Sequence, residues 1–102
     1  MSAEVHDSIT PGEILLTEFL EPLGITQYRL AQATGLSQTR ISAIVHGRRR
    51  IAPNTGLRLS RALGLSERNW INMQTDYDIE TEHDLYEEEL RLVEVLVSPE
   101  AV

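Results

Sequence analysis

Residues 26–47, TQYRLAQATGLSQTRISAIVHG, constrain the fold of this chain more than any other stretch. Thr26 and Ser37 each stand just before a helical pattern, where a side-chain oxygen can accept a hydrogen bond from an unpaired backbone N–H group. Gly35 lies between the two patterns, where the first helix must end in a left-handed conformation that glycine adopts at little cost. The stretch therefore predicts two short helices joined by a tight turn, a helix-turn-helix.

The apolar residues of this stretch predict how the two helices pack. Five of them can share one inner side: Leu30, Leu36, Ile41, Ile44 and Val45. The pattern of a small residue, a turn glycine and a buried branched aliphatic residue resembles the DNA-binding helix-turn-helix of repressor-like proteins of the Cro and phage-repressor type. Here these residues are Ala31, Gly35 and Ile41. That resemblance implies binding to duplex DNA. The alternative is a helical hairpin that uses the same packing for another purpose.

The outer face of the second helix is the predicted reading surface. At about 100° per residue, short polar or small side chains lie opposite the apolar side. Such a face can enter the major groove, where Gln pairs with adenine, Arg with guanine, and Thr or Ala meets the thymine methyl group. The predicted base contacts are Gln38, Thr39, Ser42 and Ala43, with Arg40 and His46 contacting bases or phosphates. The alternative for Thr39 and Ser42 is an ordinary solvated surface.

Charge is distributed unevenly along the chain. The net charge of −7 is unusual for a nucleic-acid binder, because Lys and Arg side chains neutralise phosphates. Residues 1–21 carry five acidic residues and no Lys or Arg, residues 22–75 carry eight arginines and one glutamate, and residues 76–102 carry ten acidic residues and one arginine. A basic centre between two acidic ends suggests two different partners.

Candidate phosphate contacts surround the second helix. Arg48, Arg49 and Arg50 directly follow it and cannot all be buried, so we expect them to bind phosphates. The alternative is that Arg49 or Arg50 pairs with an acidic residue of the same fold. The family resemblance places Gln27 at a position that donates a hydrogen bond to a DNA phosphate, and further candidates are Tyr28, Arg29 and Ser37.

Three further helices are predicted around the helix-turn-helix. The first covers residues 11–20, opened by a capping box of Thr10 and Glu13 and ended by Pro22 and Gly24. The fourth begins near Pro53 and closes at Gly64, and the fifth runs from residue 67 to about residue 77 after a cap at Ser66. We expect Trp70 in the core, and we predict that Ile71 and Tyr77 contact a second copy in a homodimer.

The two ends of the chain are predicted to lie outside the DNA-binding domain, which covers residues 10–77. Residues 1–9 lack periodicity and are expected to form a flexible arm. Residues 78–102 form a C-terminal extension with a helix over 79–89. Residues 90–97 are apolar on both faces, which favours a short strand there, the alternative being a helix end buried against another chain. Leu92 and Val95 are predicted dimer or partner contacts. Residues 87–89 are three consecutive glutamates that could meet a partner, and the alternative for them is a solvated acidic face.

Several classes of protein are excluded or disfavoured. The chain contains no Cys, which excludes disulfides and thiolate metal sites. No long apolar run or signal-peptide pattern is present, so we expect a soluble cytoplasmic protein without a membrane span. His6, His46 and His83 lie far apart in sequence and no catalytic motif accompanies them. We therefore predict one all-α, five-helix domain that is not an enzyme and binds neither metal nor cofactor.

A more specific resemblance covers about two thirds of the chain, from Thr10 to Ile79. The runs PGEILL, EPLGITQYRLA, LSQTRIS, HGRRRI, LRLSRALG and NMQTDYD resemble the HigA-type antitoxins, or addiction-module antidote proteins. The resemblance implies a homodimer that binds an inverted-repeat operator, represses its own operon and neutralises a basic mRNA endonuclease toxin of the HigB or RelE type. The sequence after Asp78 departs from this pattern.

Two other functions remain compatible with the sequence. A stand-alone transcription regulator without a toxin partner would use the same DNA-binding face. An RNA-binding module is disfavoured, because no aromatic stacking platform interrupts the basic centre.

Overall fold

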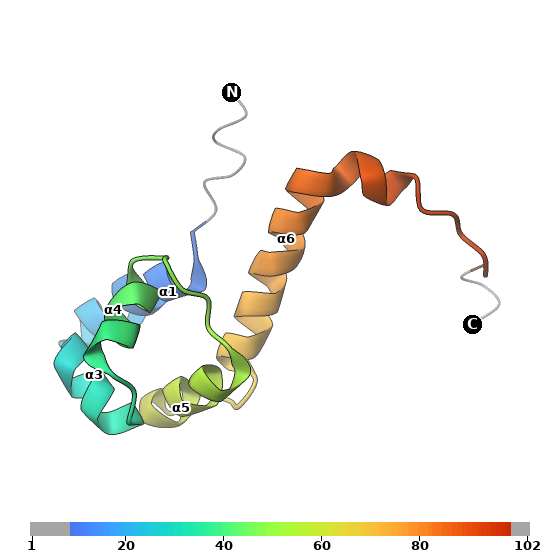
Figure 1. The fold of residues 1–102 in the computed structure, drawn as a ribbon. Coiled ribbons are helices and arrows are strands. Elements are labelled where there is room, and N and C mark those ends of the chain that lie inside the picture. Colours follow the sequence, from blue (N-terminus) through green and yellow to red (C-terminus); the bar gives the residue numbers. More distant parts are fainter. Residues whose placement is uncertain (1–8, 99–102) are drawn as a thin grey trace.

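The computed structural model describes residues 9–98, and all of its regular secondary structure in that range is helical. The elements are α1 (Pro11–Ile14), η2 (Leu15–Leu20), α2 (Glu21–Leu23), α3 (Gln27–Thr34), α4 (Gln38–Val45), α5 (Pro53–Leu63) and α6 (Asn69–Arg91). Because α1, η2 and α2 run on as one helix, the described residues form five helices (Figure 1). Apart from Ile9, the expected N-terminal arm lies outside the described residues.

The first helix begins as predicted but ends later than predicted. Thr10 Oγ1 accepts from the Glu13 N–H at 3.2 Å, and the Thr10 N–H donates to Glu13 Oε1 at 3.0 Å, which completes the capping box. The helix passes Pro22 because η2 is a π-helical stretch that ends at Leu20. Pro22 therefore lies in the first turn of the following segment, where a missing N–H is tolerated. Gly24, with φ of 68°, ends the helix.

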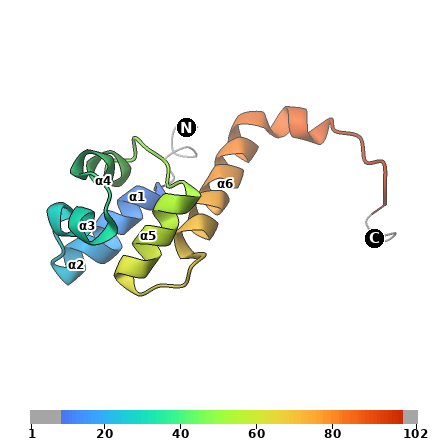
Figure 2. The ribbon, with the colours of Figure 1, turned by 60° about the horizontal axis from the view of Figure 1, so that its bottom comes forward.

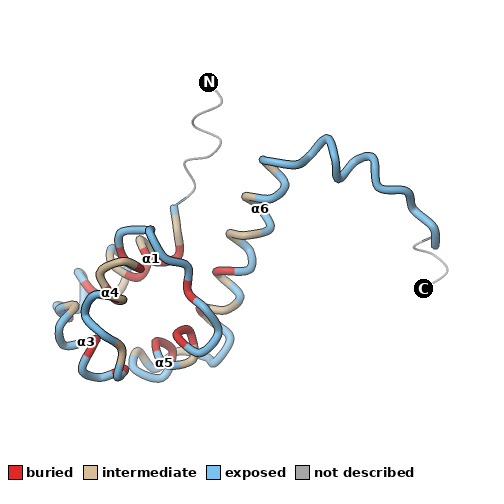
Figure 3. The backbone as a smooth tube through the Cα atoms, in the orientation of Figure 1, coloured by how far each residue is buried: buried red, intermediate tan, exposed pale blue. Residues whose placement is uncertain are grey.

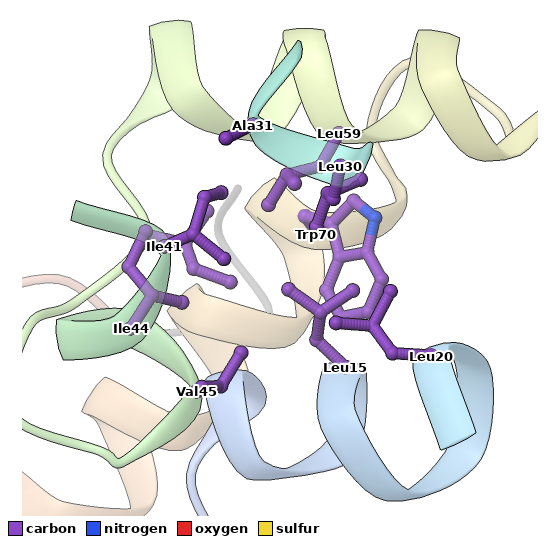
Figure 4. Close-up of a cluster of buried hydrophobic side chains, with 10 residues drawn as sticks. Leu15, Leu20, Leu30, Ala31, Ile41, Ile44, Val45, Leu59 and Trp70 are labelled. Carbon is purple, nitrogen blue, oxygen red and sulfur yellow. The ribbon is translucent and has the colours of Figure 1, made fainter. Parts of the chain in front are cut away.

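A single core lies between the first helix, the helix-turn-helix and the start of α6 (Figure 4). Trp70 is fully buried, as predicted, and its ring meets the edge of Phe19 with centroids 5.3 Å apart. Of the predicted inner side, Leu30, Ile41, Ile44 and Val45 are buried and Leu36 is half-buried, and the small Ala31 is buried as well. The apolar spacing of residues 26–47 was therefore sufficient to predict which sides of α3 and α4 face inward.

α6 differs most from the prediction. The two helices expected over residues 67–77 and 79–89 form one helix of 23 residues, with a kink at Tyr86. Its N-cap is Arg68 rather than Ser66, and no side-chain capping bond is made there. The predicted strand over residues 90–97 is wrong, since the helix continues to Arg91 and residues 92–98 are irregular. A strand needs a second strand for its backbone hydrogen bonds, and the described part of one copy offers only helices.

The distal part of α6 extends away from the helical cluster (Figure 1). Trp70 and Gln74 are its buried residues, whereas most residues after Tyr77 are exposed (Figure 3). No helix in the described range is sufficiently long and apolar to cross a membrane. The fold thus consists of a compact cluster that carries α4 at its periphery and a helical arm.

Candidate nucleic-acid interface

Local hydrogen bonds, a turn at Gly35 and packing on the first helix hold α4 in place. Ser37 caps it, because its Oγ accepts from the Arg40 N–H at 3.0 Å. Thr26 caps α3 in the same way through the Arg29 N–H at 3.0 Å, and Gly35 reverses the chain between the helices with φ of 77°. The inner side of α4 packs on the first helix, so its opposite side faces outward (Figure 2).

An open hollow lies along this outward side of α4. Its lining residues are Gln27, Gln38, Thr39, Ser42, Ala43 and Arg48. All six were predicted from the sequence to contact bases or phosphates. Gln38 and Thr39 are exposed, and Ser42 and Ala43 are half-buried at the floor of the hollow. The fold therefore brings the start of α3, the outer face of α4 and the following loop together on one accessible surface.

The other predicted DNA contacts differ in burial and in the hydrogen bonds that they make. Arg40 is half-buried, and the exposed Tyr28 hydroxyl accepts from Gln32 Nε2 at 3.1 Å. The Ser37 hydroxyl accepts the capping bond described above. His46 Nδ1 lies 2.7 Å from the Ser42 carbonyl oxygen, so the imidazole is turned back onto its own helix. Its Nε2 atom remains the one that can meet a DNA group.

The arginine loop, defined here as residues 48–50, begins where α4 ends. Gly47 adopts φ of 75°, and the Arg48 N–H donates to the Ala43 carbonyl at 2.8 Å, which holds the start of the loop against α4. All three arginines are exposed. Arg50 forms an ion pair with Asp78 of α6. The sequence had left open whether Arg49 or Arg50 would pair with an acidic residue, and Arg50 does so.

Sequence reasoning missed three residues that shape this surface. Gly12 lies so close to α4 that an added Cβ would be 1.7 Å from the Ile44 carbonyl oxygen. Gln74 and Asp78 of α6 hold the end of the arginine loop through hydrogen bonds described below. Gln74 interrupts an apolar stripe, which is the one signal that could have singled it out.

The residues predicted to form a dimer interface fall into two groups. Ile71 and Tyr77 are half-buried within the single copy. Leu92 and Val95 are 77% and 74% exposed. They belong to a larger apolar set on distal α6 and the segment after it, which comprises Ile79, Leu85, Tyr86, Leu90, Leu92, Val93, Val95, Leu96 and Val97. Exposed apolar groups gathered over one segment are typical of a surface that another molecule covers.

Comparisons with known proteins address the same region. A family model described as Helix-turn-helix matches residues 16–70. Antitoxin HigA-1 of Vibrio cholerae is 36% identical over 88 residues, 86% of this chain and 83% of that protein. Virulence-associated protein I of Dichelobacter nodosus is 46% identical over 72 residues, 71% of this chain and 67% of that protein. The structure of the Pseudomonas aeruginosa antitoxin HigA with the higBA promoter has a TM-score of 0.80 at 32% identity, covering 87% of this chain and 98% of that one.

The fold and the surface of α4 define a helix-turn-helix protein of the repressor-like class, and the matched family model spans both helices of the motif. The similarity to the antitoxins extends beyond the motif into the first helix and α6. The chain belongs to the HigA-type antitoxin family.

Proposed function

We propose that this chain binds duplex operator DNA by inserting the outer face of α4 into the major groove. The single observation that supports this proposal most directly is the open hollow lined by six predicted DNA contacts. B-DNA's major groove admits an α-helix, and the side chains of Gln38 and Thr39 are of types that read base edges. The P. aeruginosa relative, whose structure includes the higBA promoter, supports the same role.

The arginine loop supplies the electrostatic part of the proposed contact. Affinity for DNA depends on cationic side chains that displace counterions from phosphates. Arg48 lines the hollow and Arg49 and Arg50 follow it, so the cations lie where phosphates flanking an inserted helix would be. We therefore assign base recognition to the face of α4 and phosphate binding to Gln27, Tyr28, Ser37 and the arginine loop.

We further propose that two copies act together. The exposed apolar side chains of distal α6 would be covered by a second copy, with Ile71, Tyr77, Leu92 and Val95 at or near the contact. A symmetric dimer presents two recognition helices about 34 Å apart, or one turn of DNA, and reads an inverted repeat. Repression of the operon that encodes the chain follows if this repeat lies at its promoter.

Footprinting on the DNA directly upstream of the gene tests these roles. We expect two protected half-sites one turn apart for the parent chain. Gln38→Ala should relax preference at one or two base pairs per half-site, at a cost of about 1–3 kcal/mol, because alanine cannot form a bidentate pair of hydrogen bonds with a base. Arg49→Ala should weaken all sequences alike and reduce the slope of log affinity against log salt by about one.

The two variants control for each other, because each removes a polar side chain from an exposed position of the same surface. Identical effects of Gln38→Ala and Arg49→Ala on sequence preference and on the salt slope would contradict the division of roles. A single protected half-site would contradict the dimer.

We also propose that the chain neutralises a basic mRNA endonuclease toxin of the HigB or RelE type. Membership of the antitoxin family supports this proposal, as does the charge of the surfaces outside the DNA-binding face. An enzyme that binds RNA needs a cationic surface. Acidic side chains on this chain would attract that surface and raise the rate at which the two proteins associate. The exposed acidic residues that could meet it are Glu18 and Glu21 on the first helix and Glu82, Glu87, Glu88 and Glu89 on α6. The contact surface is therefore assigned to the N-terminal arm with the first helix, or to the acidic C-terminal part.

Charge reversal tests this assignment with the toxin encoded beside the gene. Glu18→Lys with Glu21→Lys, or Glu87→Lys with Glu89→Lys, should reduce toxin capture in a pull-down at least roughly tenfold, because opposite charges become like charges. Reversal of exposed Glu67, beside the basic centre, serves as the matched control and should leave capture unchanged. If all four reversals combined left capture intact in a folded chain, the assignment would be wrong. A chain that binds its operator but captures no toxin would instead be a stand-alone regulator.

A further inference from the structure

A buried amide on α6 holds the backbone at the end of the arginine loop. Gln74 is 4% exposed, and its Oε1 accepts from the Ile51 N–H at 2.8 Å. Ile51 is itself buried and directly follows Arg50. A buried N–H group without an acceptor is costly, so this hydrogen bond fixes where the loop re-enters the core.

The same amide also orients the acidic partner of Arg50. Gln74 Nε2 donates to Asp78 Oδ1 at 2.9 Å, and the other carboxylate oxygen, Oδ2, accepts from Arg50. Gln74 therefore uses both ends of its amide, one on the loop backbone and one on the carboxylate that holds the loop's last arginine. A side chain confined by two hydrogen bonds in a buried site is well suited to fix geometry.

Gln74, Asp78 and Arg50 line a hollow where the arginine loop, the start of the first helix and α6 meet. Arg48, Arg49 and Arg50 contribute to it from one side and Gln74, Tyr77 and Asp78 from the other. The loop lies at the end of the DNA-reading helix, and α6 carries the exposed apolar surface assigned to the second copy. The Gln74 amide is thus a direct polar link between α6 and the arginine loop.

We infer that Gln74 is a positioning residue for DNA binding: through Ile51 and Asp78 it sets the position of the arginine loop against the DNA backbone. This inference rests on the proposed function. It also gives α6 a second role, because the helix that joins two copies then holds the phosphate-binding loop of each. Because Gln74 is buried, we expect it to act through these neighbours rather than by touching DNA.

The test compares Gln74→Met with the parent chain. Methionine keeps the length of the side chain but neither accepts from Ile51 nor donates to Asp78. We expect the amide hydrogen exchange of Ile51 to accelerate at least roughly tenfold, as for a buried donor that loses its acceptor. With a duplex of the DNA directly upstream of the gene, the slope of log affinity against log salt should become shallower by about one, as for a chain that neutralises one phosphate fewer.

Met73→Ala is the matched control, because Met73 precedes Gln74 on α6 and packs against the core without a hydrogen bond to the loop. It should lower stability and accelerate core amides together, while the salt slope stays at the parent value. If Gln74→Met matched Met73→Ala in both Ile51 exchange and salt slope, the inference would be overturned. Failure of the parent chain itself to bind the duplex would overturn the proposed function, and the Ile51 measurement distinguishes the two failures.

Discussion

Replacing Gly12 with alanine is expected to destabilise the protein by about 3 kcal/mol, at the upper end for overpacking a core. A Cβ at this position would lie 1.7 Å from the carbonyl oxygen and 2.5 Å from the carbonyl carbon of Ile44. Both atoms belong to the backbone of α4, so no side-chain rotation can relieve the clash. The first helix and α4 must therefore move apart, which opens the core around the fully buried Ile44.

The Gly12 variant should lose DNA binding as well as stability, because its clash falls on the recognition helix itself. Urea unfolding followed by circular dichroism measures the first effect, and binding to the upstream duplex at low denaturant measures the second. The unfolded fraction of the variant accounts for part of any loss of affinity. If it accounts for the whole loss, α4 has kept its position and the expected effect on DNA binding is wrong.

Gly56→Ala provides the matched control, since Gly56 is also a buried helical glycine. Its Cβ would meet Ile71 Cγ1 at 3.3 Å, Trp70 Cβ at 3.4 Å and Ile51 Cγ2 at 3.5 Å, all of which are side-chain atoms. Helix propensity favours alanine by about 1 kcal/mol and offsets this tight fit. We expect a change within about 1 kcal/mol of zero. Equal losses for the two variants would contradict the role given to the Gly12 contact.

Trp70→Ala is expected to cost about 4 kcal/mol, within the range for truncation of a large buried aromatic side chain. Trp70 is the largest fully buried residue, and it joins α6 to the first helix through its contact with Phe19. A cavity of this size cannot close, because the surrounding side chains belong to several helices. A loss of this magnitude approaches the whole stability of a small domain, so a large unfolded fraction should be visible at 37 °C.

Tyr86→Ala is the control for Trp70→Ala. Tyr86 also lies on α6, but it is 46% exposed and beyond the core. In the monomer, the free energy of unfolding should change by about 0.5 kcal/mol or less. Measurements at several protein concentrations separate this from any loss of association between copies. A loss for Trp70→Ala as small as that for Tyr86→Ala would show that α6 is not fastened by Trp70.

The sequence predicted the helix-turn-helix because its signals are local. Thr26, Ser37 and the capping box at Thr10 act on N–H groups within three residues, and each bond forms as expected. The helical spacing of Ile41, Ile44 and Val45 also fixed which residues remain on the outer face. The composition of the candidate DNA-binding surface could therefore be predicted from the sequence.

Predictions based on the same local signals were wrong at both ends of α6 and at Pro22. Ser66 is a suitable cap residue by type, yet α6 begins after Arg68. Residues 92–97 are suited to a strand by composition but have no strand beside them in the described part of one copy. Pro22 was expected to end the first helix, and the π-helical stretch before it lets the helix continue.

What the sequence by itself determined is the helix-turn-helix, the start of the first helix, and the inner and outer faces of α3 and α4, because capping and periodicity act over a few residues. Only the tertiary structure decided that Gly12 touches the backbone of α4 and that Gln74 binds the Ile51 N–H, which is 23 residues away in sequence. It also decided that Asp78 holds Arg50. These contacts depend on the crossing of helices that are distant in sequence, and the distances at a crossing are set by packing rather than by local preference.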